Sequence, residues 1–137
     1  MERELLLDIV TPTRRVLTSK AEFVALPGVK GELGILYNHA PLVAGLTIGV
    51  LRFGSLGGMM RRAFISGGFA EVSDNRVIVL ADAAELAEEI DVLRARAAKE
   101  RAERRLRERK ADLDFQRASA ALQRAIYRLK TVGEGES

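Results

Sequence analysis

The sequence predicts an α+β fold in which a small antiparallel β-sandwich precedes an antiparallel two-helix hairpin. All three prolines and ten of the twelve glycines lie before residue 81, whereas residues 81–132 contain neither. This second part is rich in Ala, Leu, Glu, Arg and Lys, which are strong helix formers. The break predicts two domains, 1–81 and 82–137, and a short flexible tail at the end of the second.

The first part alternates short apolar runs with turn residues, which is typical of a small antiparallel sandwich. Gly, Pro, Asn or Asp separates the runs at short intervals. The runs are LLLDIV, AEFVAL, GILY, VLRF, RAFISGGFAEVS and RVIVLA. Between the last two apolar segments, Ser73–Arg76 (SDNR) predicts a hairpin turn.

The second part predicts two helices. Asp82 and Glu85 have the spacing of a capping box, so the first helix is expected to begin there. At 100° per residue its apolar face comprises Leu86, Ile90, Leu93 and Ala97. Arg94 and Arg101 fall on this face or at its edge.

A polar stretch ending at Asp112 separates the two helices, and Asp112 is expected to cap the second one. The apolar face of that helix comprises Phe115, Ala118, Leu122, Ala125, Ile126 and Leu129. Arg117, Arg124 and Arg128 lie on the opposite face. Two such helices are expected to pair as an antiparallel hairpin.

The hairpin brings arginines of the two helices together if helix rotation places them along the same edge. With a turn centred near Lys110, Arg94 faces the region between Arg124 and Arg128, and Arg101 faces the region of Arg117. Arg124 and Arg128 are like charges four residues apart, which destabilises an isolated helix by about 0.2–0.5 kcal/mol. A bound anion would relieve this repulsion. Spacing alone leaves open a solvated arginine face, with Asp91 merely paired to Arg94 and Glu85 only a cap.

Composition excludes several other kinds of site. The 137 residues include no cysteine, so neither disulfides nor thiolate metal ligands are available. His39 is the only histidine, which rules out a His-rich metal cluster. The sequence contains no G-x-x-x-x-G-K-[ST] motif, and GVKGELG lacks the dinucleotide spacing. We therefore expect no catalytic residues and no metal site.

The charge pattern also weighs against nucleic-acid and membrane binding. In the basic run KERAERRLRERK, glutamates dilute the arginines and no aromatic residues are interleaved. The N-terminal MERELLLDIV carries acidic residues, and no window approaches the length of a spanning helix. A nucleic-acid-binding protein remains the third-ranked alternative, and any membrane association is expected to be indirect.

Three segments in order resemble the epsilon subunits of bacterial F-type ATP synthases. They are residues 25–51, residues 64–85 and the helical pair through RLKTV. The most specific motifs are G-E-L-G-I-L followed by H-x-P, and S-G-G-F-x-E-V before the last strand. Many relatives have Pro-Gly where this chain has Tyr37-Asn38.

The resemblance implies a ten-stranded antiparallel β-sandwich at 1–81 that docks on the rotating central stalk, and a regulatory helical hairpin. The implied protein is a non-catalytic subunit of a proton-translocating ATP synthase, and its expected partners are the gamma subunit and the c-subunit ring. Its expected location is the cytoplasmic face of the bacterial membrane, peripheral through the complex. Residues Gly31, Glu32, Leu33, Gly34 and His39 are the expected ring-facing surface.

Some members of this family carry I-D-x-x-R-A at the first helix and bind ATP between hairpin and sandwich. The matching residues here are Ile90, Asp91, Arg94 and Ala95, joined by Glu85, Arg101, Arg124 and Arg128. The resemblance places the acidic and apolar residues beside adenosine and the arginines on phosphate. Forked guanidinium donors suit a triphosphate. Whether magnesium accompanies the nucleotide stays open.

The resemblance further implies that ATP stabilises the folded hairpin. When ATP is scarce, the extended hairpin would contact the catalytic alpha and beta subunits and inhibit ATP hydrolysis. The remaining alternative within the family is a purely structural stalk subunit that does not sense ATP.

Overall fold

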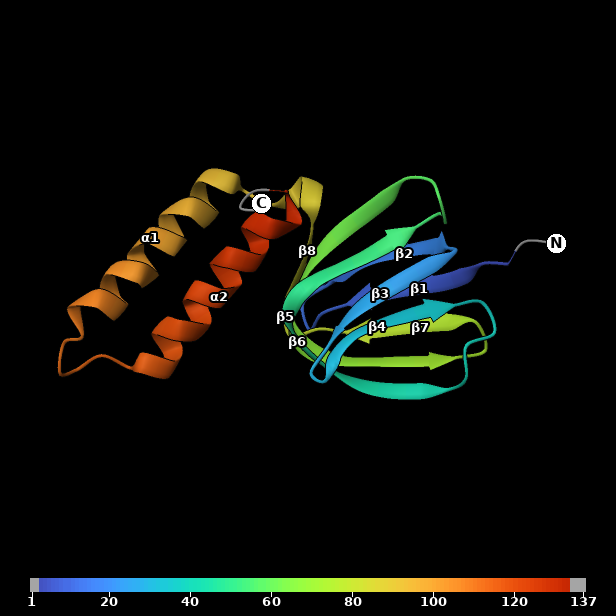
Figure 1. Ribbon diagram of the computed structural model, residues 1–137, viewed down its shortest axis with the longest axis horizontal. Helices are drawn as coiled ribbons and strands as arrows, with labels where there is room; N and C mark the ends of the chain where they lie inside the picture. Colours follow the sequence, from blue (N-terminus) through green and yellow to red (C-terminus); the bar gives the residue numbers. More distant parts are fainter. Residues whose placement is uncertain (1–2, 134–137) are drawn as a thin grey trace.

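The computed structural model describes residues 3–133 and confirms a β-sandwich followed by a two-helix hairpin (Figure 1). The elements in order are β1 (Leu5–Val10), β2 (Arg15–Ala21), β3 (Phe23–Gly28), β4 (Gly31–Leu36), β5 (Leu42–Gly54), β6 (Met60–Ser73), β7 (Arg76–Leu80), β8 (Ala84–Leu86), the 3₁₀ helix η1 (Ala87–Glu89), α1 (Val92–Glu108) and α2 (Phe115–Thr131). Neither helix has the length and apolarity needed to cross a membrane. Residues 134–137, which belong to the expected flexible tail, lie outside the described part of the chain.

The expected number of ten strands is wrong, and the expected antiparallel pairing is wrong for one pair of strands. Eight strands occur within residues 3–133, in the order β2-β1-β7-β6-β5-β3-β4, with β8 paired to β6. The sheet is mixed because β1 and β7 run parallel. Strands β5 and β6 are long and continuous, with 13 and 14 residues, and β5 extends well beyond the short run VLRF expected there.

Two glycines allow β6 to change partners along its length. Gly67 (φ 72°) and Gly68 (φ 104°) adopt positive backbone angles that residues with a side chain rarely take. Before them β6 pairs with β8, and after them it pairs with β7. β6 therefore belongs to both parts of the sandwich without a loop.

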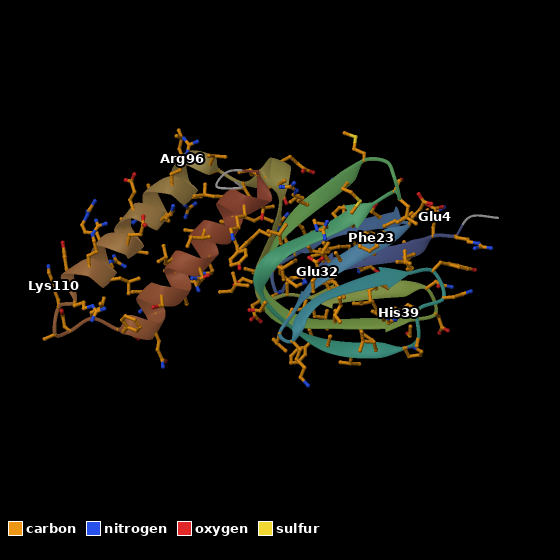
Figure 2. The ribbon with its side chains drawn as sticks, viewed as in Figure 1. Glu4, Phe23, Glu32, His39, Arg96 and Lys110 are labelled. Atoms are coloured by element: carbon orange, nitrogen blue, oxygen red, sulfur yellow. The ribbon has the colours of Figure 1, made fainter. Side chains whose placement is uncertain are left out.

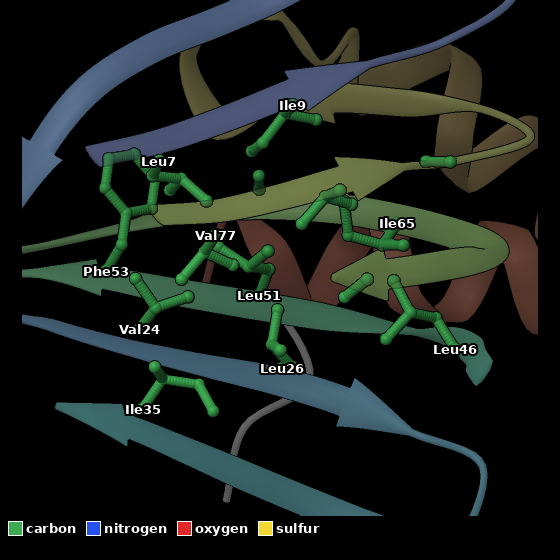
Figure 3. Packing of buried hydrophobic residues seen from close by; sticks show 14 of the residues in the cluster. Leu7, Ile9, Val24, Leu26, Ile35, Leu46, Leu51, Phe53, Ile65 and Val77 are labelled. Atoms are coloured by element: carbon green, nitrogen blue, oxygen red, sulfur yellow. The ribbon is translucent and has the colours of Figure 1, made fainter. Parts of the chain in front are cut away.

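The core of the sandwich lies between the two halves of the sheet (Figure 3). Alternate residues of each strand point into it, as period-two patterning requires. Its largest members include Leu7, Ile9, Leu26, Leu51 and Phe53, each at most 1% exposed. Complete burial of a side chain of this size contributes about 1.5–3 kcal/mol.

The predicted turn at Ser73–Arg76 is confirmed. Ser73 pairs with Arg76, and both Asp74 and Asn75 have positive φ, as in a two-residue type I′ hairpin. Asn75 also meets the turn after β4, where its side chain accepts a hydrogen bond from the backbone N–H of Asn38. Asn38 has φ 64°. Asparagine tolerates this left-handed conformation better than most residues that carry a side chain.

The first helix does not begin at Asp82. Residues Ala84–Leu86 pair with Ala63–Ile65 of β6 as strand β8, and α1 begins only at Val92. Sheet pairing satisfies the backbone of this segment and outweighs its helix propensity. Because the start is displaced, the predicted apolar face is also wrong. Leu93 is 74% exposed, and the buried residues of α1 are Ala95 and Ala102.

The second helix begins at Phe115, with Asp114 and not Asp112 as its N-cap. The reason is the end of α1, where Arg109 adopts a left-handed conformation and a turn from Lys110 to Leu113 follows. The predicted apolar face is largely confirmed, since Ala118, Ala125 and Leu129 are buried. Phe115 is the exception and is 57% exposed.

The hairpin lies against one side of the sandwich, with α2 between α1 and the sheet (Figure 1). Helix α2 contacts β5 and β6, and α1 packs mainly on α2. The small buried residues Ala95, Ala102, Ala118 and Ala125 allow the two helices to approach closely. The sandwich thus positions α2 directly, and α1 through α2.

Candidate functional site

The segment joining sandwich and hairpin is held by two arginines of the sandwich. In η1, Glu89 accepts two hydrogen bonds from Arg14, at 2.9 and 3.1 Å, and one from the backbone N–H of Leu86 at 2.9 Å. The hydrogen bond from Arg14 is the main cause that lowers the pKa of Glu89. Arg61 of β6 pairs with Glu88 at 2.8 Å. This connection is therefore tied to the sandwich immediately before α1 begins.

Glu85 and Arg128, two of the predicted ATP ligands, bind each other. The Nε atom of Arg128 donates to Oε1 of Glu85 over 2.6 Å. The guanidinium also lies 4.5 Å from the centre of the Phe64 ring, a cation–π contact. Both charged side chains are about one-third exposed, so solvent reaches them. The pair joins the C-terminal half of α2 to strands β6 and β8.

Phe64 was not predicted as a site residue. It is fully buried, yet it is absent from the core cluster inside the sandwich. Strand residues Ala63, Phe64 and Ile65 are buried in succession, which requires that both faces of β6 be covered. This unbroken apolar run is the signal in the sequence from which the covering of both faces of β6 could have been predicted. Nearby, Arg62 donates to the carbonyl of Lys130 at 3.3 Å and adds a second link to α2.

The I-D-x-x-R-A residues lie where α1 begins, and three of them have structural roles. Ile90 is 8% exposed and Ala95 is buried against the hairpin interior. Asp91 is the N-cap, and its carboxylate accepts the backbone N–H of Arg94 at 3.0 Å. The Arg94 side chain is exposed. Of the four, Arg94 is the residue whose side chain the fold itself does not require.

Arg101 and Arg124 lie farther along the hairpin and line one groove of about 790 Å³ together with Arg117. Arg101 and Arg117, which were expected to face each other, both line this groove, whereas Arg94 and Arg128 are not among its lining residues. Figure 2 shows Lys110, another residue of this groove, at the end of the hairpin remote from the sandwich.

The predicted ATP-binding residues therefore form two groups. Glu85 and Arg128 meet beside the sandwich, whereas Arg101 and Arg124 line the groove. From Arg94 to Arg101 the helix rises about 10.5 Å, and from Arg124 to Arg128 about 6 Å. A ligand that contacts both groups must be elongated and must follow the seam between the helices. A nucleoside triphosphate has this shape.

The expected ring-facing residues lie along an edge strand. Gly31, Glu32, Leu33 and Gly34 belong to β4, which ends the sheet order, and His39 follows in the next loop. Figure 2 shows Glu32 and His39 toward opposite ends of this strand. Glu32 forms an ion pair with Arg52 at 2.7 Å. The Nδ1 atom of His39 is hydrogen-bonded to the carbonyl oxygen of Ala40.

An exposed apolar patch on β5, β6, β7 and the turn after β3 was not predicted. Phe69 and Leu80 are direct cross-strand partners and are 63% and 56% exposed. Val43, 72% exposed, lies on the neighbouring strand on the same face, and Val29 adjoins it through Gly45. We call Val29, Val43, Phe69 and Leu80 the apolar patch. Contiguous exposed apolar side chains of this kind mark protein interaction sites.

The chain matches two family models that together cover nearly its whole length. Residues 4–87 match the β-sandwich domain of the ATP synthase delta/epsilon chain, and residues 88–133 match the long α-helix domain of the same chain. An ATP synthase epsilon chain of Symbiobacterium thermophilum is 56% identical over 131 residues, which cover 95% of this chain and 94% of the relative. That of Syntrophomonas wolfei is 54% identical over 129 residues, or 94% of each chain.

Solved structures agree with these relatives. A chain in the Euglena gracilis mitochondrial ATP synthase OSCP/F1/c-ring structure superposes with a TM-score of 0.75 at 26% identity, covering 90% of this chain and 78% of that one. A chain of the Tetrahymena thermophila mitochondrial ATP synthase central stalk and c-ring has a TM-score of 0.59 at 14% identity, covering 96% and 98%. The second likeness concerns the fold alone.

Proposed function

Because the chain belongs to the epsilon subunits of bacterial F-type ATP synthase, which are part of the central stalk, we propose that it couples the catalytic head to the membrane ring and senses ATP through its hairpin. The observation that carries this proposal is the position of the predicted ligands. They lie on both helices and on the connection to the sandwich, so one bound molecule would hold all three together.

The proposed ATP site follows the seam of the hairpin. Adenosine lies near Glu85, Ile90, Asp91 and Ala95, and the phosphates lie near Arg94, Arg101, Arg124 and Arg128. A ligand shifts a conformational equilibrium only by its differential affinity for the two states. ATP that binds only the closed hairpin favours it by about 1.4 kcal/mol at ten times its dissociation constant.

The inhibitory role follows from the loss of this ligand. When ATP is scarce, the hairpin leaves the sandwich and its arginines contact the catalytic alpha and beta subunits, which slows ATP hydrolysis. The connection at residues 84–89 remains on the sheet through Arg14 and Arg61 during this movement. The division of labour between residues 1–81 and the hairpin is part of the same proposal.

Calorimetry of the whole chain with ATP, ADP and GTP tests the sensor. We expect ATP to bind more tightly than the other two. Arg94→Ala should weaken ATP binding by about tenfold or more, since hydrogen bonds to charged groups contribute about 1.5–3 kcal/mol. Because the Arg94 side chain is exposed, the free energy of unfolding of the variant should differ from that of the parent by less than about 0.5 kcal/mol.

The matched variant is Asp91→Asn. Asparagine remains a good N-cap, so this change removes the carboxylate charge while the start of α1 is retained. Reduced ATP affinity in Asp91→Asn, together with normal thermal unfolding, would assign the carboxylate to the ligand. Unchanged ATP affinity in both variants would show that the proposed site is misplaced.

The second candidate function is a purely structural stalk subunit. It is favoured by the contacts that already hold α2 on the sandwich, namely Arg128 with Glu85 and Phe64, and Arg62 with the carbonyl of Lys130. A docked hairpin of this kind needs no nucleotide. Absence of ATP binding by calorimetry would select this candidate.

For assembly, we propose that the apolar patch docks on the gamma subunit and that the β4 surface with His39 faces the c-ring. Phe69→Ser should prevent co-purification with the gamma subunit, because a large apolar contact would be lost. Leu56→Ser is the control, since Leu56 is similarly exposed at 60% but lies in the loop after β5. If Phe69→Ser still co-purifies with gamma, the docking surface lies elsewhere.

A further inference from the structure

The groove near the end of the hairpin contains more cationic side chains than the proposed ATP site uses. Six basic residues line it, drawn from both helices and the loop between them: Arg101, Arg104, Arg105, Lys110, Arg117 and Arg124. Three carboxylates share the groove. Of these, Asp114 is occupied as the N-cap of α2, and Glu108 contacts Lys110 at 3.7 Å. We call this site the arginine groove.

The five arginines of the groove differ from those of the sandwich in their partners. Sandwich arginines are matched to carboxylates within 3 Å, and these pairs include Arg14, Arg15, Arg52, Arg61 and Arg76. Within residues 3–133, none of the five groove arginines forms an ion pair. With six basic and three acidic side chains the groove keeps a net positive charge, which is unfavourable when the helices close and which a bound anion would offset.

The shape of the groove favours a small polyanion over an extended macromolecule. Its volume of about 790 Å³ is within the range of small-molecule pockets, and residues of α1, α2 and their connecting loop line it. Arg117 and Arg124 are about 10.5 Å apart along α2. One phosphate is too small to contact both guanidinium groups in the plane of each. Several linked phosphates can follow this line.

We propose that the arginine groove binds a linear chain of three or more linked phosphates, and that it does so without an adenosine group. Each guanidinium offers a planar fork that matches the oxygens of a phosphate. Arg101 and Arg124 also belong to the proposed ATP site. Arg104, Arg105, Lys110 and Arg117 do not, so the inference goes beyond that proposal and needs none of its nucleoside contacts.

The test is calorimetry of the whole chain with sodium tripolyphosphate, with orthophosphate as the short-chain comparison. Tripolyphosphate should bind at least about tenfold more tightly than orthophosphate, because it contacts arginines of both helices at once. The variant Arg105→Gln/Arg117→Gln removes one groove arginine from each helix and should weaken tripolyphosphate binding by about tenfold or more. Circular dichroism confirms that the variant is folded.

The matched control is Arg107→Gln/Arg109→Gln, which loses the same charge from the same region but does not alter the groove lining. Its affinity for tripolyphosphate should stay within about twofold of the parent, as expected when only long-range charge is lost. Equal losses in the two double variants would overturn the proposal, because binding would then depend on net charge alone. Equal affinity for tripolyphosphate and a hexaglutamate peptide would also overturn it and indicate a protein-docking surface.

These measurements distinguish failure of the phosphate-chain proposal from failure of the ATP proposal. If ATP binds and tripolyphosphate does not, the phosphate-chain site is refuted while the ATP sensor stands. If tripolyphosphate binds and ATP binds no more tightly than it does, the phosphate-chain site stands and the nucleoside contacts near Asp91 are refuted.

Discussion

Gly68→Ala is expected to lower the free energy of unfolding by at least about 3 kcal/mol. Gly68 has φ 104°, where a residue with a Cβ atom is strained. An added Cβ would also overlap the carbonyl oxygen of Leu80 and lie 2.8 Å from the Cα of Ala81. These are backbone atoms at the end of β7, and they cannot move without breaking the pairing of β6 with β7. Urea unfolding followed by circular dichroism measures the loss.

Gly57→Ala is the control for this variant. Gly57 also has a positive φ, of 70°, but nothing lies within 4 Å of an added Cβ. Its cost is therefore only the strain of an alanine in the left-handed conformation, about 1–2 kcal/mol. If the two variants lose the same stability, the overlap with β7 contributes nothing and the account of β6 given above is wrong.

Arg128→Ala is expected both to undock α2 and to weaken ATP binding. The change removes the ion pair with Glu85 and the cation–π contact with Phe64, and it leaves the Glu85 carboxylate partly buried without a partner. With a discount for the one-third exposure of both side chains, this costs about 2 kcal/mol. ATP affinity should fall by about tenfold or more, since the proposed phosphate contact is lost as well.

Energy transfer measures the undocking directly. The sequence has no cysteine, so Ser55→Cys in the loop after β5 and Gln116→Cys on α2 give two specific labelling sites, both exposed. Transfer should fall in Arg128→Ala and should not recover when ATP is added. The control Arg107→Ala removes an exposed arginine of α1 and should behave as the parent. A normal ATP response in Arg128→Ala would contradict the proposed role of Arg128.

Local patterns predicted the elements whose determinants lie within a few residues. The turn at Ser73–Arg76 and the buried face of α2 are of this kind. Strand β8 was mistaken for helix because Ala84, Glu85 and Leu86 are all helix formers, and only pairing with β6 makes them a strand. The parallel pairing of β1 with β7 joins segments about seventy residues apart. No local signal marks such a contact.

The residues of the candidate site could be predicted from the sequence, but their arrangement in space could not. The family resemblance named the ATP-binding candidates, and helix periodicity predicted that arginines converge. Neither could show that Arg128 meets Glu85 while Arg124 lies with Arg101 in a separate groove, because that depends on where the loop between the helices begins. That loop begins with the left-handed conformation of Arg109, and because this position usually takes Gly or Asn, an arginine there gives no signal.

The length of β5 and β6 has a mechanical consequence. The apolar patch lies partly on these two strands, and α2 rests on the same two strands elsewhere along their length. Torque applied at the patch would therefore reach the hairpin through hydrogen-bonded strands, which resist shear, and would not have to cross a flexible loop. In a rotating assembly this makes the sandwich a stiff spacer, and elastic deformation should be concentrated at the short connection between Ile90 and the start of α1.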